Sequence, residues 1–201
     1  EIHLPPGPDP LHGAGPEAVP AAGVVHRGFN PRIYTTYAMP LSLGVCGERE
    51  CMDIRLTEEV PFSELTVRLN ACLPRGLRAL EAGEPVGKFE EIQYGEYEMA
   101  LEGEDPAVLE EKVRSLLERE TVLVRKHTKK ATRTLTSNRI LPTPGLFPKR
   151  TGCSFTFACL QRGGKHQPSL LLEALKQYEG IEPFFQITRK RLLTKDFSEF
   201  R

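Results

Sequence analysis

The residues best suited to chemistry are a run of cations at 125–130, Arg-Lys-His-Thr-Lys-Lys, which Arg133 extends. Lys and Arg bind phosphates, and each phosphate that they neutralise adds a salt-dependent increment to the affinity for a nucleic acid. In a strand, alternate side chains point to opposite faces, so both faces here would be cationic, as in an edge strand or its overhanging end. The run predicts polyanion binding. The alternatives are a solvated edge and a surface that docks on acidic groups.

Other cations join this run in the predicted anion- or RNA-binding set. Lys165 follows Gly163 and Gly164 just before a predicted helix, and glycines, a lysine and free N–H groups at a helix start suit an anion. The alternative there is a plain hairpin turn, because the spacing of a P-loop is absent. The whole set comprises Arg32, Arg125, Lys126, Lys129, Lys130, Arg133, Lys165, Arg189, Lys190 and Arg191.

A second motif, GFNPR, is a candidate recognition loop. Gly28 permits close backbone approach, Asn30 and Pro31 set a turn after Phe29, and Arg32 is a forked donor for phosphate or carboxylate. The alternative is a structural turn whose phenylalanine fills the core.

The segment PLSLG, at residues 40–44, is interpreted as architectural. Its proline and glycine shape a connection between strands, and Leu41 and Leu43 are expected to face the core. Strand tyrosines could stack on nucleic-acid bases or fill the core. They are Tyr34, Tyr37, Tyr94 and Tyr97.

Histidine is the residue type that would make this chain an enzyme. The candidate general bases for metal-independent RNA cleavage are His26, His127 and His166, of which the last two lie in cationic segments. No Walker, dinucleotide-binding, hydrolase or zinc-protease signature occurs, and no two cysteines have the C-x-x-C spacing of a metal site. We therefore expect no catalytic activity of the chain's own, no cofactor and no metal.

The net charge of zero hides a strong asymmetry. Residues 1–120 contain 11 Lys and Arg against 22 Asp and Glu, and residues 121–201 contain 16 against 5, which sum to the 27 of each sign. The two parts therefore carry −11 and +11. This predicts either mutual neutralisation across an interface or a basic part that meets a polyanion such as RNA.

Composition places the chain among cytoplasmic globular proteins. Hydrophobic residues make up 39% and charged residues 27%, and no apolar run approaches the length of a membrane span. The five cysteines are odd in number and scattered, which suits free thiols in a reducing compartment.

The predicted elements alternate strands with helices after a Pro- and Gly-rich arm. Apolar periodicity and turn residues define them. Strands are expected at 1–4, 33–38, 50–57, 76–82, 94–102, 121–135, 153–161 and 184–193, and helices at 62–73, 105–120 and 168–180. Residues 138–152 are expected to form a loop broken by proline and glycine.

This order predicts an α+β fold of two tandem ferredoxin-like (split βαβ) units. The arm occupies residues 1–27. Residues 28–88 form a partial unit that lacks its opening strand and helix, and residues 89–201 form a complete unit with a basic sheet surface.

Residues 28–56 contain GFNPR, a strand, PLSLG-V, an acidic loop and an M-D-I-R-L strand. Taken in order, these motifs resemble the uncharacterised radical-SAM-linked protein family, and the resemblance extends over residues 26–193. It implies an accessory role near RNA, beside or fused to cobalamin-binding radical SAM proteins.

We therefore expect an accessory RNA-associated binding module that acts with a radical SAM partner protein. One alternative is a pure protein-interaction subunit of such a system. The other is a metal-independent RNA endonuclease of the CRISPR repeat-processing kind. No membrane partner is expected.

Overall fold

A computed structural model describes residues 2–3, 25–26, 32–56, 59–119, 121–124, 133–136, 140–149, 152–160 and 168–201. The chain divides into two compact units. Unit 1 is Glu1–Glu91 with Phe200–Arg201, and unit 2 is Ile92–Glu199. The sequence places the boundary between its two predicted units slightly earlier, after Lys88. Each unit is described by itself below.

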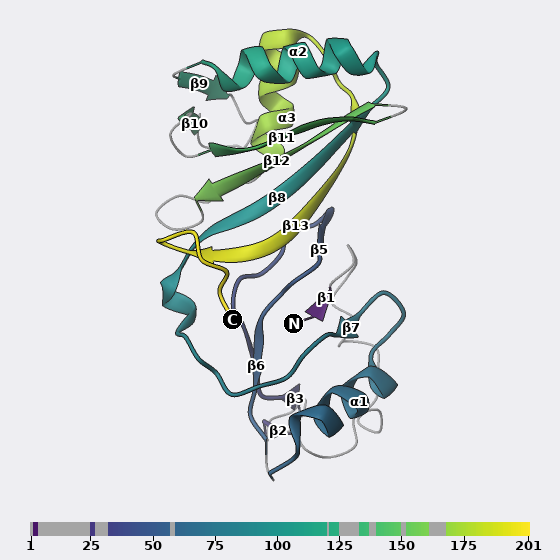
Figure 1. Ribbon diagram of the computed structural model, residues 1–201, viewed down its shortest axis with the longest axis vertical. Helices are drawn as coiled ribbons and strands as arrows, with labels where there is room; N and C mark the ends of the chain where they lie inside the picture. The colour runs from purple at the N-terminus through teal and green to yellow at the C-terminus, as the bar shows by residue number, and fades with distance from the viewer. Residues whose placement is uncertain are drawn as a thin grey trace. The chain divides into compact units, whose positions relative to one another are not determined.

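Unit 2 is built on four long antiparallel strands, β8 (Ile92–Glu102), β11 (Ile140–Lys149), β12 (Gly152–Leu160) and β13 (Phe184–Thr194). Their order in the sheet is β11-β12-β8-β13, as Figure 1 shows. The strands at the centre, β8 and β12, have a neighbouring strand on each side and carry long buried runs.

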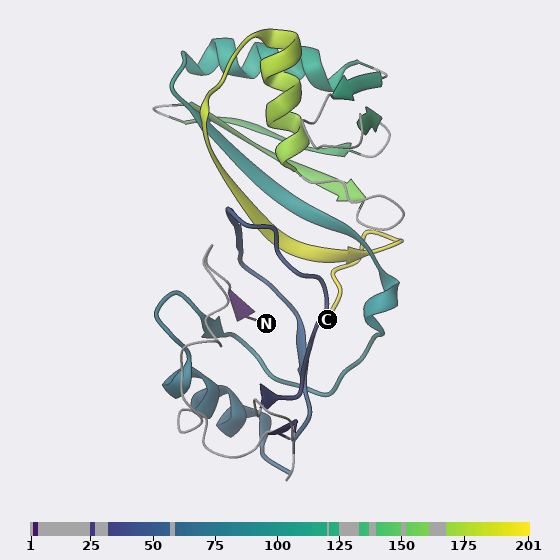
Figure 2. The same ribbon diagram turned by 180° about the vertical axis from the view of Figure 1, so that it is seen from behind.

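Helices cover one face of this sheet (Figure 2). They are α2 (Pro106–Leu117), α3 (Ser169–Ala174) and the π-helical turn η4 (Leu175–Glu179) that continues α3. Asp105 caps α2 by accepting a hydrogen bond from the Ala107 N–H at 2.8 Å, an interaction typically worth about 1 kcal/mol. The buried face of α2 is Leu109, Val113 and Leu116. Val108, also on this helix, is 39% exposed and lies outside that face.

The sheet residues that meet these helices alternate along β8. Tyr97, Met99 and Leu101 are buried, and Leu101 lies opposite Cys153 of β12. The negative charge of Glu110 on α2 raises the pKa of the Cys153 thiol, so the two groups lie near each other. This face of the sheet is therefore the one that the helices cover. Residues between them along β8, including Glu96 and Glu98, point to the other face.

Two elements of unit 2 differ from the prediction. The expected strand 121–135 is a hairpin of β9 (Thr121–Val124) and β10 (Arg133–Thr136), in which Arg133 pairs with Val124. The expected loop 138–152 contains β11. Its three prolines are compatible with a strand because β11 lies at the edge of the sheet, where one side needs no ladder hydrogen bonds.

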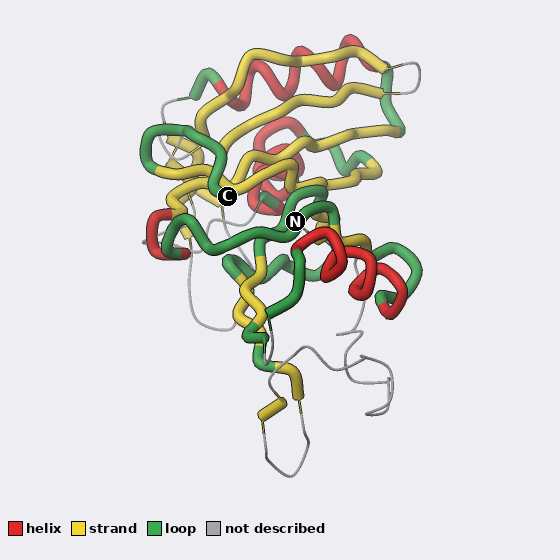
Figure 3. Tube along the Cα trace, turned by 60° about the horizontal axis from the view of Figure 1, so that its bottom comes forward, coloured by secondary structure: helices red, strands yellow, loops and turns green. Residues whose placement is uncertain are grey.

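Unit 1 contains short strand pairs and one helix, α1 (Phe62–Cys72) (Figure 3). Three antiparallel pairs are described: β1 with β7, β2 with β3, and β4 with β6. Their bounds are Ile2–His3, Arg78–Ala79, Val25–His26, Arg32–Ile33, Thr35–Tyr37 and Met52–Ile54; β5 is Val45–Gly47 and the 3-10 turn η2 is Phe89–Glu91. The strand expected at 1–4 is thus present as β1.

The PLSLG segment forms a turn in unit 1. The Val45 N–H donates to the Ser42 carbonyl at 3.2 Å, and Gly44 has a φ of +82°, the left-handed conformation that favours glycine. Leu43 is 88% exposed at this turn, so its expected place in the core is wrong. It precedes the glycine at a corner position, where side chains point outward.

The protein is therefore α+β. The assignment of both units to the ferredoxin-like fold stays a prediction, because the strands of unit 1 are described only as short pairs. In the part of the chain that the structure describes, no helix is long and apolar enough to cross a bilayer.

Candidate nucleic-acid interface

One end of the unit 2 sheet gathers the connections that the sequence singles out. Ile140 lies opposite Cys159, Cys159 opposite Gly95, and Gly95 opposite Leu192. This row crosses the start of β11, the end of β12, the start of β8 and the end of β13. The chain therefore enters β11 and leaves β12 and β13 at the same end of the sheet, which we call the row-95 end.

Two of the segments next to the row-95 end are cationic, whereas the turn 195–199 after β13 contains one Lys and two acids. Residues 125–139, which include β10 and precede β11, contain six Lys and Arg and no Asp or Glu, and residues 161–167 after β12 contain two and none. At the opposite end, the connection 103–105 from β8 to α2 contains two acids and no Lys or Arg. The cations of the segments before β11 and after β12 are thus separated by the length of the sheet from the acids of the β8–α2 connection.

Most of the predicted binding residues lie outside the described residues. These are Gly28, Phe29, Asn30, Pro31, Arg125, Lys126, His127, Lys129, Lys130, Lys165 and His166. Residues 27–31 link β2 to β3, and residues 125–132 link β9 to β10. Arg32 and Arg133 are described in their backbone, at the start of β3 and of β10 respectively.

The three remaining cations, on β13, are separated by an irregularity in pairing. Arg189 lies opposite Tyr97 and Arg191 lies opposite Glu96, so Lys190 is an extra residue in the strand. Such a bulge shifts the alternation of side chains by one. Arg189 therefore faces the helices and is 1% exposed, whereas Arg191 faces the other way.

Acidic groups of β8 hold the two outer cations. Arg191 donates to Glu96 from Nε at 2.5 Å and from Nη2 at 3.3 Å, and its Nη1 lies 4.0 Å from Glu199. The Lys190 Nζ lies 3.5 Å from Glu98. Because Glu96 is 8% exposed, the fork of hydrogen bonds is what makes its burial favourable. Lys190 and Arg191 thus already have anionic partners in unit 2.

An aromatic pair stands at the row-95 end. The rings of Tyr94 and Phe197 stack with centroids 4.5 Å apart and an interplanar angle of 19°. Phe197 is 47% exposed and has a φ of +59°. A non-glycine residue in this conformation costs roughly 1–2 kcal/mol, and a stack of this kind contributes about 0.5–1.5 kcal/mol. The stack therefore offsets the backbone strain.

The tyrosines that the sequence singled out have different surroundings. Tyr97 is 3% exposed and stacks on Phe157 in the core, at a centroid distance of 5.8 Å. Tyr34 is 44% exposed, and the Arg55 guanidinium lies 5.2 Å from its ring centroid. Phe197 was missed, because it lies after the last predicted strand and its sequence neighbours carry no turn glycine.

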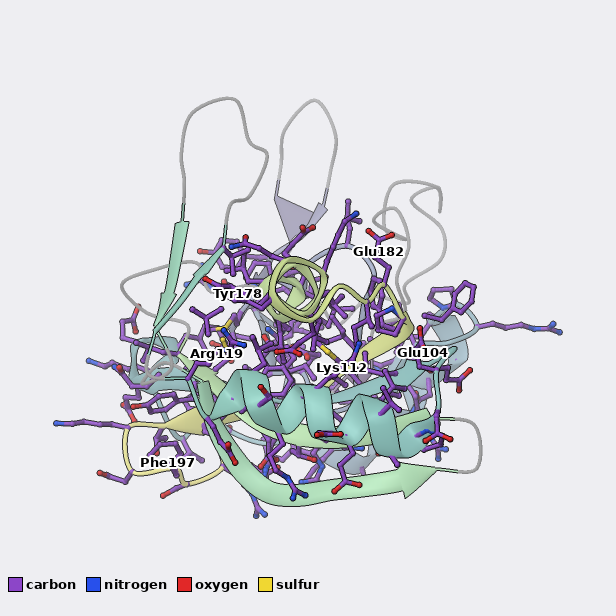
Figure 4. The ribbon with its side chains drawn as sticks, turned by 90° about the horizontal axis from the view of Figure 1, so that it is seen from above. Glu104, Lys112, Arg119, Tyr178, Glu182 and Phe197 are labelled. Atoms are coloured by element: carbon purple, nitrogen blue, oxygen red, sulfur yellow. The ribbon has the colours of Figure 1, made fainter. Side chains whose placement is uncertain are left out.

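A second polar cluster joins α2 to η4, and several of its members are labelled in Figure 4. Lys112 donates to the Glu179 carbonyl at 3.0 Å, and Arg119 reaches the Glu179 carboxylate at 3.3 Å and lies over Tyr178 at 4.9 Å from the ring centroid. Ser115 also donates to that carboxylate, at 3.5 Å. Because Lys112 and Ser115 lie on α2 and Arg119 follows its end, this cluster fastens α2 to η4.

The thiols offer no metal site within the described residues, where no three His, Cys, Asp or Glu side chains gather. All five cysteines are free. Burial raises the pKa of Cys159 to about 12. The pKa of Cys153 is also raised, mainly by burial and to a smaller extent by the nearby Glu110 carboxylate. Both buried thiols are therefore protonated and poorly nucleophilic at neutral pH.

Comparison with known proteins identifies the family. Residues 25–142, more than half of the chain, match the model of the family described as "Uncharacterized protein conserved in bacteria (DUF2344)". The chain belongs to this family. The matched DUF2344 region includes the GFNPR and PLSLG motifs, the cationic run and Tyr94, and it ends at the start of β11. No curated protein matches the chain. The link to radical SAM proteins stays a prediction.

Proposed function

We propose that this DUF2344 protein is an RNA-associated binding module that acts with a radical SAM partner protein. The feature that supports RNA most strongly is the charge of the segments next to the row-95 end: residues 125–139, which precede β11, and residues 161–167, which follow β12, contain eight Lys and Arg and no acid. Clustered cations with this separation from acidic segments favour a polyanionic ligand. The partner protein is inferred from the family resemblance.

The ion pairs and burial on β13 argue against its three cations as RNA contacts. Lys190 and Arg191 are already paired with Glu98 and Glu96, so a phosphate would compete with those carboxylates. Arg189 is buried. The proposed RNA contacts are therefore the cations of residues 125–139 and 161–167 rather than those of β13.

RNA binding is tested by fluorescence anisotropy with a labelled single-stranded RNA. We expect the affinity to fall steeply between about 50 mM and about 200 mM salt. The variant Lys126→Glu/Lys129→Glu/Lys130→Glu should bind at least about tenfold more weakly, and its log–log salt slope should be smaller by about two. The control, Arg75→Glu/Arg78→Glu/Lys88→Glu, changes net charge equally at exposed positions of unit 1 and should bind like the wild type.

The partner is tested separately. A pull-down between the purified protein and the radical SAM protein of the same organism should survive nuclease treatment. Retention of this complex without any RNA affinity would favour the pure protein-interaction subunit. Cleavage of labelled RNA without metal, abolished in His127→Ala or His166→Ala, would instead favour the endonuclease. Equal, weak RNA binding by the wild type and both triple variants would contradict the proposal.

A further inference from the structure

The start of β13 carries two adjacent phenylalanines that the fold leaves in solvent. Phe184 is 78% exposed and Phe185 is 54% exposed. Phe184 lies opposite Glu102 and Phe185 opposite Leu101, so the two rings leave opposite faces of the strand at its very end. Single exposed apolar residues are ordinary, but two large ones together at one end of a sheet form a patch of the kind that binds another molecule.

Packing inside the protein accounts for little of either ring. The Phe184 ring lies beside Gly103, where an added Cβ would be 3.4 Å from the ring carbon Cδ2. Gly103 has a φ of +109°, a conformation that other residues rarely adopt, so this position supplies no side chain to cover the ring. Among the residues that the structure describes, neither phenylalanine stacks on another aromatic ring. The two rings are therefore available to an external partner.

Acidic side chains lie next to the rings. Glu102 is directly opposite Phe184, and Glu104 and Asp105 follow in the connection to α2; all three are exposed. In Figure 4, Glu104 and Glu182 lie on the side where α2 begins. Asp105 is engaged as the cap of α2, whereas no ion pair joins Glu102 or Glu104 to any residue of the described ranges. Two carboxylates beside the rings are thus left to interact with a partner.

Cations at this end of the sheet are either paired or distant. Glu182, two residues before the rings, forms an ion pair with Lys176. Lys149 ends β11, and Arg150 follows it in the chain. The strands β12 and β8 lie between β11 and β13, so three strand spacings, about 14 Å, separate the end of β11 from the strand that carries the rings. The surface around the phenylalanines is therefore apolar and net negative.

We propose that Phe184 and Phe185 form the docking surface for a basic segment of a partner protein. Apolar side chains of that segment would cover the rings, and its Lys or Arg would lie beside Glu102 and Glu104. A nucleic acid does not fit, because its phosphates would meet carboxylates. A second copy docked through the same surface does not fit either, because a twofold axis would bring the same acids face to face. The proposal does not rest on RNA binding.

The test is a selection from a phage-displayed library of random peptides of about fifteen residues on the immobilised full chain. The library is first depleted on Phe184→Thr/Phe185→Thr, so that peptides that bind elsewhere are removed. Peptides then enriched on the wild type should combine Lys or Arg with apolar residues. By fluorescence anisotropy they should bind the variant at least about tenfold more weakly. Threonine suits an exposed strand, so the melting temperature should stay within about 3 °C of the wild type.

The role of charge is tested with the same peptides. Glu102→Gln/Glu104→Gln should weaken their binding at least about threefold and reduce its salt dependence. The matched control, Glu111→Gln/Glu118→Gln, removes two exposed acids elsewhere on unit 2 and should bind like the wild type.

Three results would overturn the inference. They are the absence of enriched peptides after depletion, enriched peptides without an excess of Lys and Arg, and a melting temperature of Phe184→Thr/Phe185→Thr lowered by more than about 3 °C. The last result would show that the rings are already covered within the chain. The affinity for RNA should be the same in the phenylalanine variant and the wild type, so this inference and the proposed function stand or fail separately.

Discussion

Asn70 of α1 and Ala79 of β7 exchange two hydrogen bonds. The Asn70 Nδ2 donates to the Ala79 carbonyl at 2.9 Å, and its Oδ1 accepts from the Ala79 N–H at 2.9 Å. A side-chain amide carries the same donor and acceptor as a peptide group. Asn70 therefore does for one side of β7 what a neighbouring strand would do, while β1 pairs on the other side.

The first prediction concerns this pair. Ala79 is 3% exposed, so Asn70→Ala leaves a buried N–H and carbonyl without their partner and should lower the free energy of unfolding of unit 1 by about 1–3 kcal/mol. Urea denaturation followed by circular dichroism measures the loss. The control is Thr66→Ala on the same helix, which removes an exposed bond to the Phe62 carbonyl and should cost less than about 0.5 kcal/mol. Equal losses would contradict the prediction.

Gly152, at the start of β12, should tolerate no side chain. A Cβ there would lie 1.9 Å from the Leu101 carbonyl oxygen, which is backbone of the paired strand and cannot move aside alone. Gly152→Ala should destabilise unit 2 by about 3 kcal/mol or more. Gly83→Ala meets no atom within 4 Å and should leave the melting temperature nearly unchanged. Similar melting temperatures for the two variants would refute the clash.

The thiols should divide into two classes toward iodoacetamide in the native protein. Cys46, Cys51 and Cys72 are partly exposed and should react first. Cys153 and Cys159 are buried with raised pKa values, so they should react only after unfolding. Mass spectrometry of peptides from native and urea-treated samples measures this. Early modification of Cys159 would show that its strand opens.

Burial of the Cys159 thiol should also make stability depend on alkaline pH. Its pKa rises from an ordinary 9.0 to about 12 in the folded protein. The unfolded chain therefore releases this proton first, and the stabilisation is full below pH 9.0 and is lost as the pH rises toward 12. Cys159→Ala should flatten the fall of the melting temperature over that range relative to Cys72→Ala. Parallel curves for the two variants would argue against it.

The ion pair of Arg119 with Glu179 should show measurable coupling. Arg119 is about two-fifths exposed and Glu179 is largely covered, so a double-mutant cycle with alanine should give about 0.5–1 kcal/mol at low salt. The comparison is Arg114 with Glu110, an i,i+4 pair on the same helix at 2.6 Å, for which we expect about 0.3–0.5 kcal/mol. A smaller coupling for Arg119 than for Arg114 would contradict the role assigned to the cluster.

Much of the framework was predictable because its patterns are local. The apolar spacing after Pro61, the cap at Asp105 and the alternation in 94–102 predict α1, α2 and β8, and all three are confirmed. β11 was not predictable from local rules, since Pro142 and its neighbours are acceptable only at a sheet edge, which is a property of the whole sheet.

The candidate site was predictable in its charge but not in its geometry. The cationic run 125–130 is visible in the sequence, yet its place between β9 and β10 depends on where the strand turns back. Alternation predicts that Arg189 and Arg191 share a face, and the bulge separates them. The left-handed conformation of Phe197 could not be predicted from the sequence, because that conformation usually falls on glycine.

The extra residue in β13 also bears on how this strand can change in evolution. Loss of Lys190 would leave Arg189 opposite Tyr97 and Arg191 opposite Glu96, now in a regular ladder. Loss of Thr188 would also leave a regular ladder, but it would put Arg189 opposite Glu98 on the outer face and Lys190 opposite Tyr97 on the buried face. Deletions at different positions of β13 should therefore differ in how much they destabilise unit 2. Lys190 is the position where β13 can lose a residue while every other side chain keeps its face of the sheet.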